Sequence, residues 1–152
     1  MAKSVAKKDL KSRIQNAETF LALDIGLKRT GAATGSLFTK TATPAGALVV
    51  NNGRHDWAGL DALVEQWAPD AIVIGDPQSS DPHLNKAINR VKSHIHRWHK
   101  LPIIDVDERL TSSAANESLS QQNISQQRKT ELRDQVAAAI ILETYFNSLN
   151  KD

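Results

Sequence analysis

The stretch FLALDIG (20–26) decides how the fold begins. Its first four residues are apolar and have the length of a short buried strand. The strand runs into an acid, Asp24, and then into Gly26, which allows another group to approach the backbone closely. A carboxylate beside a buried strand is costly unless it is paired or binds a cation. The stretch therefore predicts a strand that delivers an acid to a binding site, with a turn or cap carboxylate as the simpler alternative.

Two more strands are predicted directly after this one, over 29–35 and 41–50, where Thr, Ala, Val and Gly dominate. A turn near 36–40 joins them, so the three strands form an antiparallel meander. Further along, AIVIG (71–75) is a fully apolar run of the kind that lies between two helical layers. PIIDV (102–106) predicts a fifth strand.

Helices are predicted between and after the later strands. The first, capped near Asp56 and stopped by Pro69, has an apolar stripe of Leu60, Leu63, Val64 and Trp67. The second starts at Asp81-Pro82 and has the stripe Leu84, Ile88, Val91, Ile95 and Trp98. A short helix is predicted over 112–119. A long last helix is predicted over roughly 129–149, with buried positions that include Val136, Ile140 and Tyr145.

The order of elements is therefore β-β-β-α-β-α-β-α-α. Three meander strands followed by βαβ crossovers predict an α/β fold with a mixed five-stranded sheet and helices on both faces. This is the order of the RNase H-like fold. A length of 152 residues suits one domain of ordinary size. We place that domain at 19–150, after a basic arm at 1–18 that we expect to be flexible.

The formal charge of +2 is unevenly distributed. Residues 1–13 contain five basic side chains and one acid, whereas the rest of the chain is slightly acidic. A basic arm on a near-neutral body suits a polyanionic partner, and a solvated, frayed terminus is the equal alternative.

Composition excludes several classes of protein. The chain has no cysteine, so a disulfide framework, a thiolate nucleophile and a cysteine zinc site are excluded. No apolar run reaches the roughly 20 residues of a membrane span. The basic N-terminal segment lacks the apolar stretch of a secretory signal. We expect a cytoplasmic protein with no membrane partner.

Two other acids stand in positions comparable to that of Asp24. Glu108 follows the fifth strand in DVDERLT (105–111), where alternation turns Asp107 and Glu108 to opposite faces, so only one of them can join a common site. Asp134 lies on the last helix, and three alanines that follow it let the helix approach the sheet closely. Each acid alone is more simply interpreted as part of a surface ion pair.

The combination of these three acids predicts a shared metal site. Divalent cations such as Mg²⁺ prefer oxygen ligands, which carboxylates supply together with negative charge. Two such cations about 4 Å apart beside a phosphate serve phosphodiester hydrolysis. We expect in-line attack of a metal-activated water that leaves a 3′-hydroxyl and a 5′-phosphate.

Four segments of the chain resemble the YqgF family, in the same order and over about residues 20–147. They are DIGLKRTGAA (24–33), IVIGDP (72–77), DERLTS (107–112) and KTELRDQVAAAIILETYF (129–146). The resemblance implies an RNase H-like fold related to the RuvC-type resolvases. It implies Asp24, Glu108 and Asp134 as catalytic and metal-binding residues, with Mg²⁺ or Mn²⁺ in a two-metal site. It also implies processing of the 5′ end of pre-16S rRNA.

Basic residues near these acids are expected to hold the phosphates of a nucleic acid substrate, with ordinary ion pairs as the alternative. They are Lys28, Arg29, Arg109 and Lys129. The chain departs from the family pattern at Asp76, which stands where the family has Leu, and in QSSDPH (78–83), which lacks the usual Gly. Asp76 is either an addition to the metal site or a polar contact on the helix side.

Other functions remain open on sequence alone. The chain is either a pre-rRNA nuclease, a Holliday junction resolvase acting on branched DNA, or a nucleic-acid-binding module without catalysis. The spacing from Asp24 to Gly31 also occurs in actin-like ATPases, but those resemble two such domains around a nucleotide. A resolvase needs two symmetric active sites and therefore a dimer. We expect a monomer or a weak homodimer, because no apolar surface stripe clearly demands a dimer.

Histidines and tryptophans give weaker signals. His94, His96 and His99 suggest zinc, but residues two apart point in different directions on a helix, so we do not predict a site there. The basic face of the second helix is interpreted as a solvated face. The three tryptophans are expected in the core rather than on a base-stacking surface. They are Trp57, Trp67 and Trp98.

Overall fold

A five-stranded mixed sheet forms the centre of the computed structural model, which describes residues 2–108 and 126–149, with side chains for 9–108 and 132–149. The strands lie in the order β3-β2-β1-β4-β5. The first three pair antiparallel, and β1–β4 and β4–β5 pair parallel. Their bounds are β1 Thr19–Ile25, β2 Arg29–Ser36, β3 Ala42–Val49, β4 Ala71–Asp76 and β5 Ile103–Asp107. The predicted sheet is confirmed.

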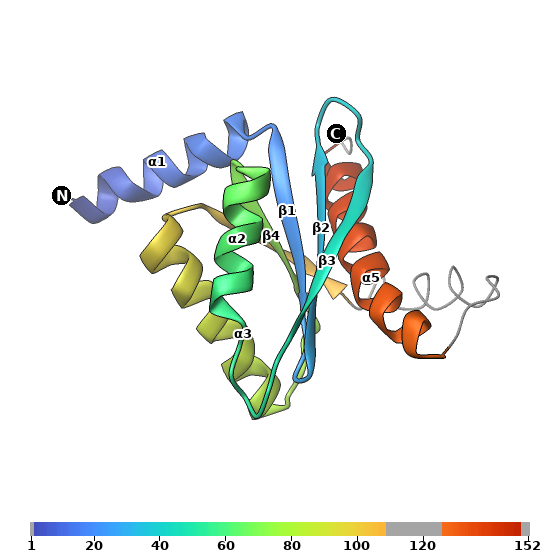
Figure 1. Cartoon of the computed structure of the whole chain (residues 1–152). Helices are drawn as coiled ribbons and strands as arrows, with labels where there is room; N and C mark the ends of the chain where they lie inside the picture. The colour runs from blue at the N-terminus through green and yellow to red at the C-terminus, as the bar shows by residue number, and fades with distance from the viewer. Residues whose placement is uncertain (1, 109–125, 150–152) are drawn as a thin grey trace.

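Helices cover both faces of this sheet (Figure 1). On one side lie α2 (Trp57–Trp67) and α3 (Pro82–His94), which continues into the π-helical turn η1 (Ile95–His99). On the other side α5 (Gln126–Ser148) runs along the sheet. The predicted helix at 112–119 lies outside the described residues.

Aspartate N-caps determine where α2 and α3 begin. The Asp56 carboxylate accepts a hydrogen bond of 2.9 Å from the backbone N–H of Gly59. The Asp81 carboxylate accepts one of 2.9 Å from the N–H of His83, and Pro82 takes the first turn, where its missing N–H costs nothing. Both predicted starts are confirmed.

Strand alternation divides the core into two layers. The side chains of Leu21, Leu23 and Ile25 pack with α2 and α3, as do Ile72 and Ile74. The side chains at the alternate positions pack against Ile141, Leu142, Tyr145 and Phe146 of α5; they are Phe20, Ala22, Ala71 and Val73. The next position of β1 in this second series is Asp24. An acid therefore continues an apolar row on the α5 face.

Helix α5 crosses β2 closely because β2 carries almost no side chains on that face. Ala33 packs directly on Ala138 and Ala139. At Gly31 a Cβ would collide with the backbone carbonyl group of Asp134, so only glycine fits there without displacing the helix. The predicted approach of an alanine face to the sheet is confirmed.

Residues 2–16 of the expected flexible basic arm form a helix, α1 (Ala2–Asn16), and Figure 1 shows it pointing away from the sheet. Its four lysines and two alanines favour a helix, whereas its low mean hydropathy gives it little tendency to enter the core. Within α5, Val136 and Ile140 are only partly buried, because the face that meets the sheet is centred on Ala138 and Leu142.

The tryptophan expectation is also wrong at two positions. Trp98 is 65% exposed and Trp67 is 38% exposed. The wider turn of η1 carries Trp98 off the apolar stripe of α3, which a regular helical period had predicted. None of the described helices has both the length and the apolar character needed to cross a membrane.

Alanine at Gly31 is expected to destabilise the fold more than alanine at Gly75. The Cβ at Gly31 meets the backbone of α5, whereas at Gly75 the nearest atom is the flexible end of Ile141, 2.5 Å away. Overpacking against a fixed group costs about 1–3 kcal/mol. Urea unfolding of both variants measures the difference, and an equal or reversed order contradicts this packing.

Candidate active site

Two glycines flank Asp24 in the sheet. On β2, Gly31 is the direct cross-strand partner of Asp24. On the other side, β1 pairs with β4 through Leu23 and Ile74, so the next residues along are Asp24 and Gly75. The three residues face the same side of the sheet. The space beside the Asp24 side chain is therefore free of neighbouring side chains from both adjacent strands.

Each glycine makes room for another acid. The space above Gly31 is filled by α5 at Asp134. The space above Gly75 is filled by Glu108, whose carboxylate oxygen lies 3.3 Å from the position that a Cβ of Gly75 would take. The carboxyl group of Glu108 also forms a hydrogen bond with that of Asp24. The fold thus brings together three acids that are far apart in sequence.

The environment of Asp24 favours its neutral form. Burial is the largest cause that raises its pKa, followed by the hydrogen bond with Glu108 and the negative charges of Glu108 and Asp134. Together they raise the pKa of Asp24 from 3.8 to about 9. A carboxylate held under these conditions binds either a proton or a cation. A divalent cation is the group that would let all three acids ionise.

Asp134 already has one cationic neighbour. The Nε of Arg29 donates a hydrogen bond of 2.6 Å to Oδ2 of Asp134, and the two side chains are 34% and 22% exposed. The pair is partly shielded from water, so it orients the Asp134 carboxylate. Arg29 was predicted to lie near the acids and contact phosphate. It does lie at the site, where its Nε donates to the carboxylate of Asp134.

An open depression of about 590 Å³ contains these groups. The acids Asp24, Glu108 and Asp134 line it, together with Lys28 and Arg29. Its apolar wall includes Leu27, Pro77 and Leu84, none of which was predicted to line the site. The glycines at 31 and 75 were missed as well, although a glycine inside a strand often signals close approach of another group.

The remaining predicted residues divide into two groups. Arg109 lies outside the described residues, and Lys129 lies on α5 with a side chain that is not described. Asp76 is not among the residues that line the depression. Its Oδ1 accepts a hydrogen bond of 2.9 Å from the backbone N–H of Gln78, which has a positive φ of 55°. Asp76 therefore stabilises the turn after β4, and its polar contact lies within that turn rather than on a helix.

Comparison with known proteins agrees with this geometry. Residues 18–148 match the family model described as "RuvX: Holliday junction resolvase". A Burkholderia vietnamiensis protein named "Putative pre-16S rRNA nuclease" is 34% identical over 135 residues, which cover 87% of this chain and 91% of that protein. A Legionella pneumophila protein of the same name is 33% identical over 129 residues, covering 83% and 93%.

Solved structures show the same fold at low sequence identity. The fowlpox virus Holliday junction resolvase aligns with a TM-score of 0.56 and 16% identity, covering 86% of this chain and 99% of that one. RuvC of T. thermophilus, solved with a Holliday junction substrate, aligns with a TM-score of 0.55 and 13% identity, covering 87% and 95%. The RNase H-like fold expected from the sequence is confirmed.

The raised pKa of Asp24 predicts how stability depends on pH. Because the folded chain holds the Asp24 proton more tightly than the unfolded chain, this group makes the protein less stable as pH rises from about 4 towards 9. Asp24→Asn removes that loss. In chelator at pH 8 the variant is expected to melt at least about 2 °C above the parent, and near pH 4 the difference disappears.

Asp105→Asn is the matched control, because Asp105 lies half-exposed on β5 in an ion pair of 2.8 Å with Lys92. It should shift melting very little. Melting curves of parent and Asp24→Asn that coincide at pH 8 would show that Asp24 is not held in a repulsive site.

Proposed function

The chain belongs to the RuvX (YqgF) family, and on that basis we propose that it is a divalent-metal-dependent nuclease that processes the 5′ end of pre-16S rRNA. The observation that carries the proposal is the convergence of Asp24, Glu108 and Asp134 in one open depression. A nuclease of this kind needs oxygen ligands beside a surface that a nucleic acid backbone can reach. The depression has both features.

The donor set fits Mg²⁺ or Mn²⁺. All three acidic side chains offer oxygen atoms, and the hard divalent cations prefer oxygen. Burial is the main cause of the raised pKa of Asp24, and the negative charges of Glu108 and Asp134 raise it further although Arg29 pairs with Asp134. When bound, such ions lower the pKa of a water nucleophile and stabilise the leaving oxygen. Asp24 would hold them from β1, Glu108 from the residue that follows β5, and Asp134 from α5.

The basic residues have distinct roles in this proposal. Arg29 fixes the direction of the Asp134 carboxylate through its Nε. Its remaining guanidinium nitrogens are available to a phosphate at the rim of the depression. Lys28 lies on the same rim and acts as a point charge for a neighbouring phosphate. Arg109 and Lys129 extend this set on the strength of the family resemblance.

RNA is favoured over DNA as the substrate by the curated relatives, which are named as pre-16S rRNA nucleases at 32–34% identity. The second candidate is resolution of branched DNA, because the matching family model carries the description of a Holliday junction resolvase. A resolvase cuts two strands symmetrically and needs two sites in a dimer. A role in rRNA processing requires one site only, and it would place the protein in the cytoplasm with the ribosome precursors.

The first test compares cleavage by the parent protein and Asp24→Asn. With Mg²⁺ or Mn²⁺, the parent is expected to cut an RNA that carries the 5′ precursor end of 16S rRNA. Changes to residues that only support the metal ligands lower activity by roughly 10- to 100-fold. Asp24→Asn should lower the cleavage rate by more than this, because it removes a ligand itself. Asp105→Asn should keep its activity. Cleavage by Asp24→Asn at the parental rate would remove Asp24 from the site.

A four-way DNA junction under the same conditions separates the two candidate substrates. We expect the RNA to be cut and the junction to be left intact by the monomer. Cutting of the junction alone, together with a dimer on size-exclusion chromatography, would support the resolvase instead.

A further inference from the structure

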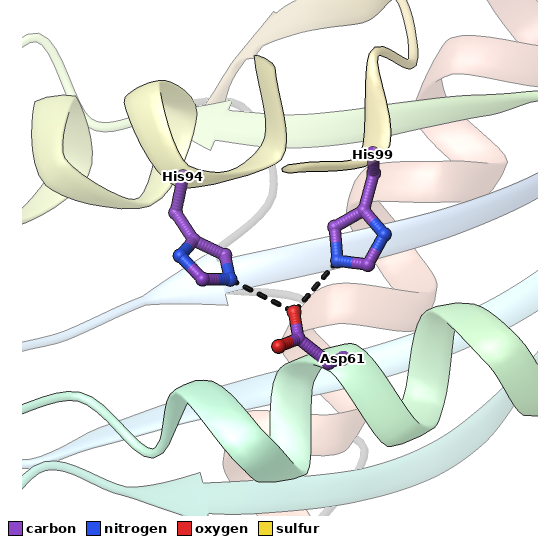
Figure 2. A group of neighbouring side chains, drawn as sticks. All are labelled: Asp61, His94 and His99. Carbon is purple, nitrogen blue, oxygen red and sulfur yellow. Dashed lines mark hydrogen bonds and ion pairs between the residues drawn. The ribbon is translucent and has the colours of Figure 1, made fainter. Parts of the chain in front are cut away.

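Three side chains from three elements converge on the face of the sheet opposite the acids (Figure 2). Asp61 comes from α2, His94 from the end of α3 and His99 from the end of η1. The Nε2 of His94 lies 2.8 Å from Oδ1 of Asp61, and the Nε2 of His99 lies 2.6 Å from the same oxygen. Among the residues with described side chains, these three form the group of potential metal ligands whose donor atoms all lie within 4.8 Å of one another.

The π-helical turn is what brings the two histidines together. An α-helix advances about 100° per residue, so residues five apart would point roughly 140° away from each other. In η1 the backbone N–H of Lys100 instead reaches the carbonyl of Ile95, five residues earlier, at 2.9 Å. This wider turn directs His99 to the same carboxylate as His94. Such single π turns frequently occur at functional sites.

This geometry revises the sequence interpretation of the histidines. A regular helical period predicts no zinc site because it points His94 and His96 in different directions, and His96 is indeed exposed and outside the cluster. The pair His94 and His99, five residues apart, was not predicted, because a regular helix points their side chains in different directions. A carboxylate from α2, distant in sequence, completes the group.

The two imidazoles are held in place and shielded. Their side chains are 13% and 15% exposed, whereas that of Asp61 is 40% exposed. The ring of Trp57 stacks on His94 with a centroid distance of 4.3 Å and an interplanar angle of 16°. The nitrogen donors therefore have fixed directions, and the open side of the group lies at Asp61, where a water can complete the coordination of an ion.

We propose that Asp61, His94 and His99 form a binding site for Zn²⁺. Two imidazole nitrogens and one carboxylate oxygen are a recurring zinc donor set, with water as fourth ligand. Zinc bonds of about 2.0–2.2 Å put tetrahedral ligand atoms roughly 3.3 Å apart. The N–O distances of 2.8 Å and 2.6 Å must therefore lengthen by about 0.5 Å and about 0.7 Å. Rotation of the half-exposed Asp61 side chain provides this movement. The ion ties α2 to the junction of α3 and η1.

The two sites of the molecule differ in the ions that they select. The depression at Asp24 offers only carboxylate oxygens, which suit Mg²⁺ and Mn²⁺. The group at Asp61 offers mainly imidazole nitrogen, which suits zinc and its neighbours in the transition series. The zinc proposal does not depend on the nuclease proposal, because no residue is shared between the two sites.

The test is a calorimetric titration of tag-free, metal-stripped protein with Zn²⁺ in the presence of excess Mg²⁺. We expect one equivalent to bind and the melting temperature to rise. His99→Gln and Asp61→Asn should weaken binding by roughly tenfold or more and lose the rise in melting temperature. The matched control is His96→Gln, one turn away and outside the group, which should bind as the parent does. Asp24→Asn should also bind normally.

A spectroscopic measurement on the unaltered chain avoids any effect of substitution on folding. Co²⁺ in place of Zn²⁺ should give the visible absorption of a four-coordinate nitrogen and oxygen site, and one equivalent of Zn²⁺ should remove it. Absence of saturable binding by the parent, or equal binding by His99→Gln and Asp61→Asn, would overturn the proposal. The three side chains would then be a hydrogen-bonded bridge between helices.

Discussion

The absence of side chains at two positions beside Asp24 is the constraint on which the rest of the site depends. Gly31 on β2 and Gly75 on the β4 side leave the α5 face of the sheet bare around this acid. The backbone of α5 packs against Gly31, and the Glu108 carboxylate packs against Gly75. Without these two gaps, packing at ordinary distances would hold Asp134 and Glu108 away from Asp24. Close packing, rather than attraction between the acids, therefore assembles the site.

The same packing creates an electrostatic cost. Burial removes the water that would stabilise the Asp24 carboxylate, and the neighbouring Glu108 and Asp134 repel its charge, so the pKa of Asp24 is raised when no cation is present. Apolar packing supplies the compensating stability: Phe20, Ile141 and Phe146 are almost fully buried along the same face. Arg29 relieves part of the repulsion at Asp134. Because the empty site destabilises the fold, binding of a divalent ion should stabilise the protein. Many active sites carry a similar cost in stability that their function requires.

Much of the fold and the position of the acids could be predicted from sequence, because they follow from local patterns. These patterns are properties of short segments: the apolar run before Asp24, the caps at Asp56 and Asp81, and the alternation that separates Asp107 from Glu108. Three features could not be predicted in this way. The π turn that redirects Trp98 and His99 is a departure from regular period. The Arg29–Asp134 pair joins residues 105 positions apart. The role of Gly31 depends on where a distant helix packs.

The central claim is that one cation-binding centre is shared by three acids from β1, the end of β5 and α5. Diffraction from Mn²⁺-soaked crystals, with data collected at the manganese edge, tests it most directly, since anomalous density marks the ion independently of any assumed chemistry. The account predicts a manganese peak in contact with carboxylate oxygens of Asp24, Glu108 and Asp134. A fully occupied peak elsewhere, with these three carboxylates still bonded only to protein groups, would contradict it.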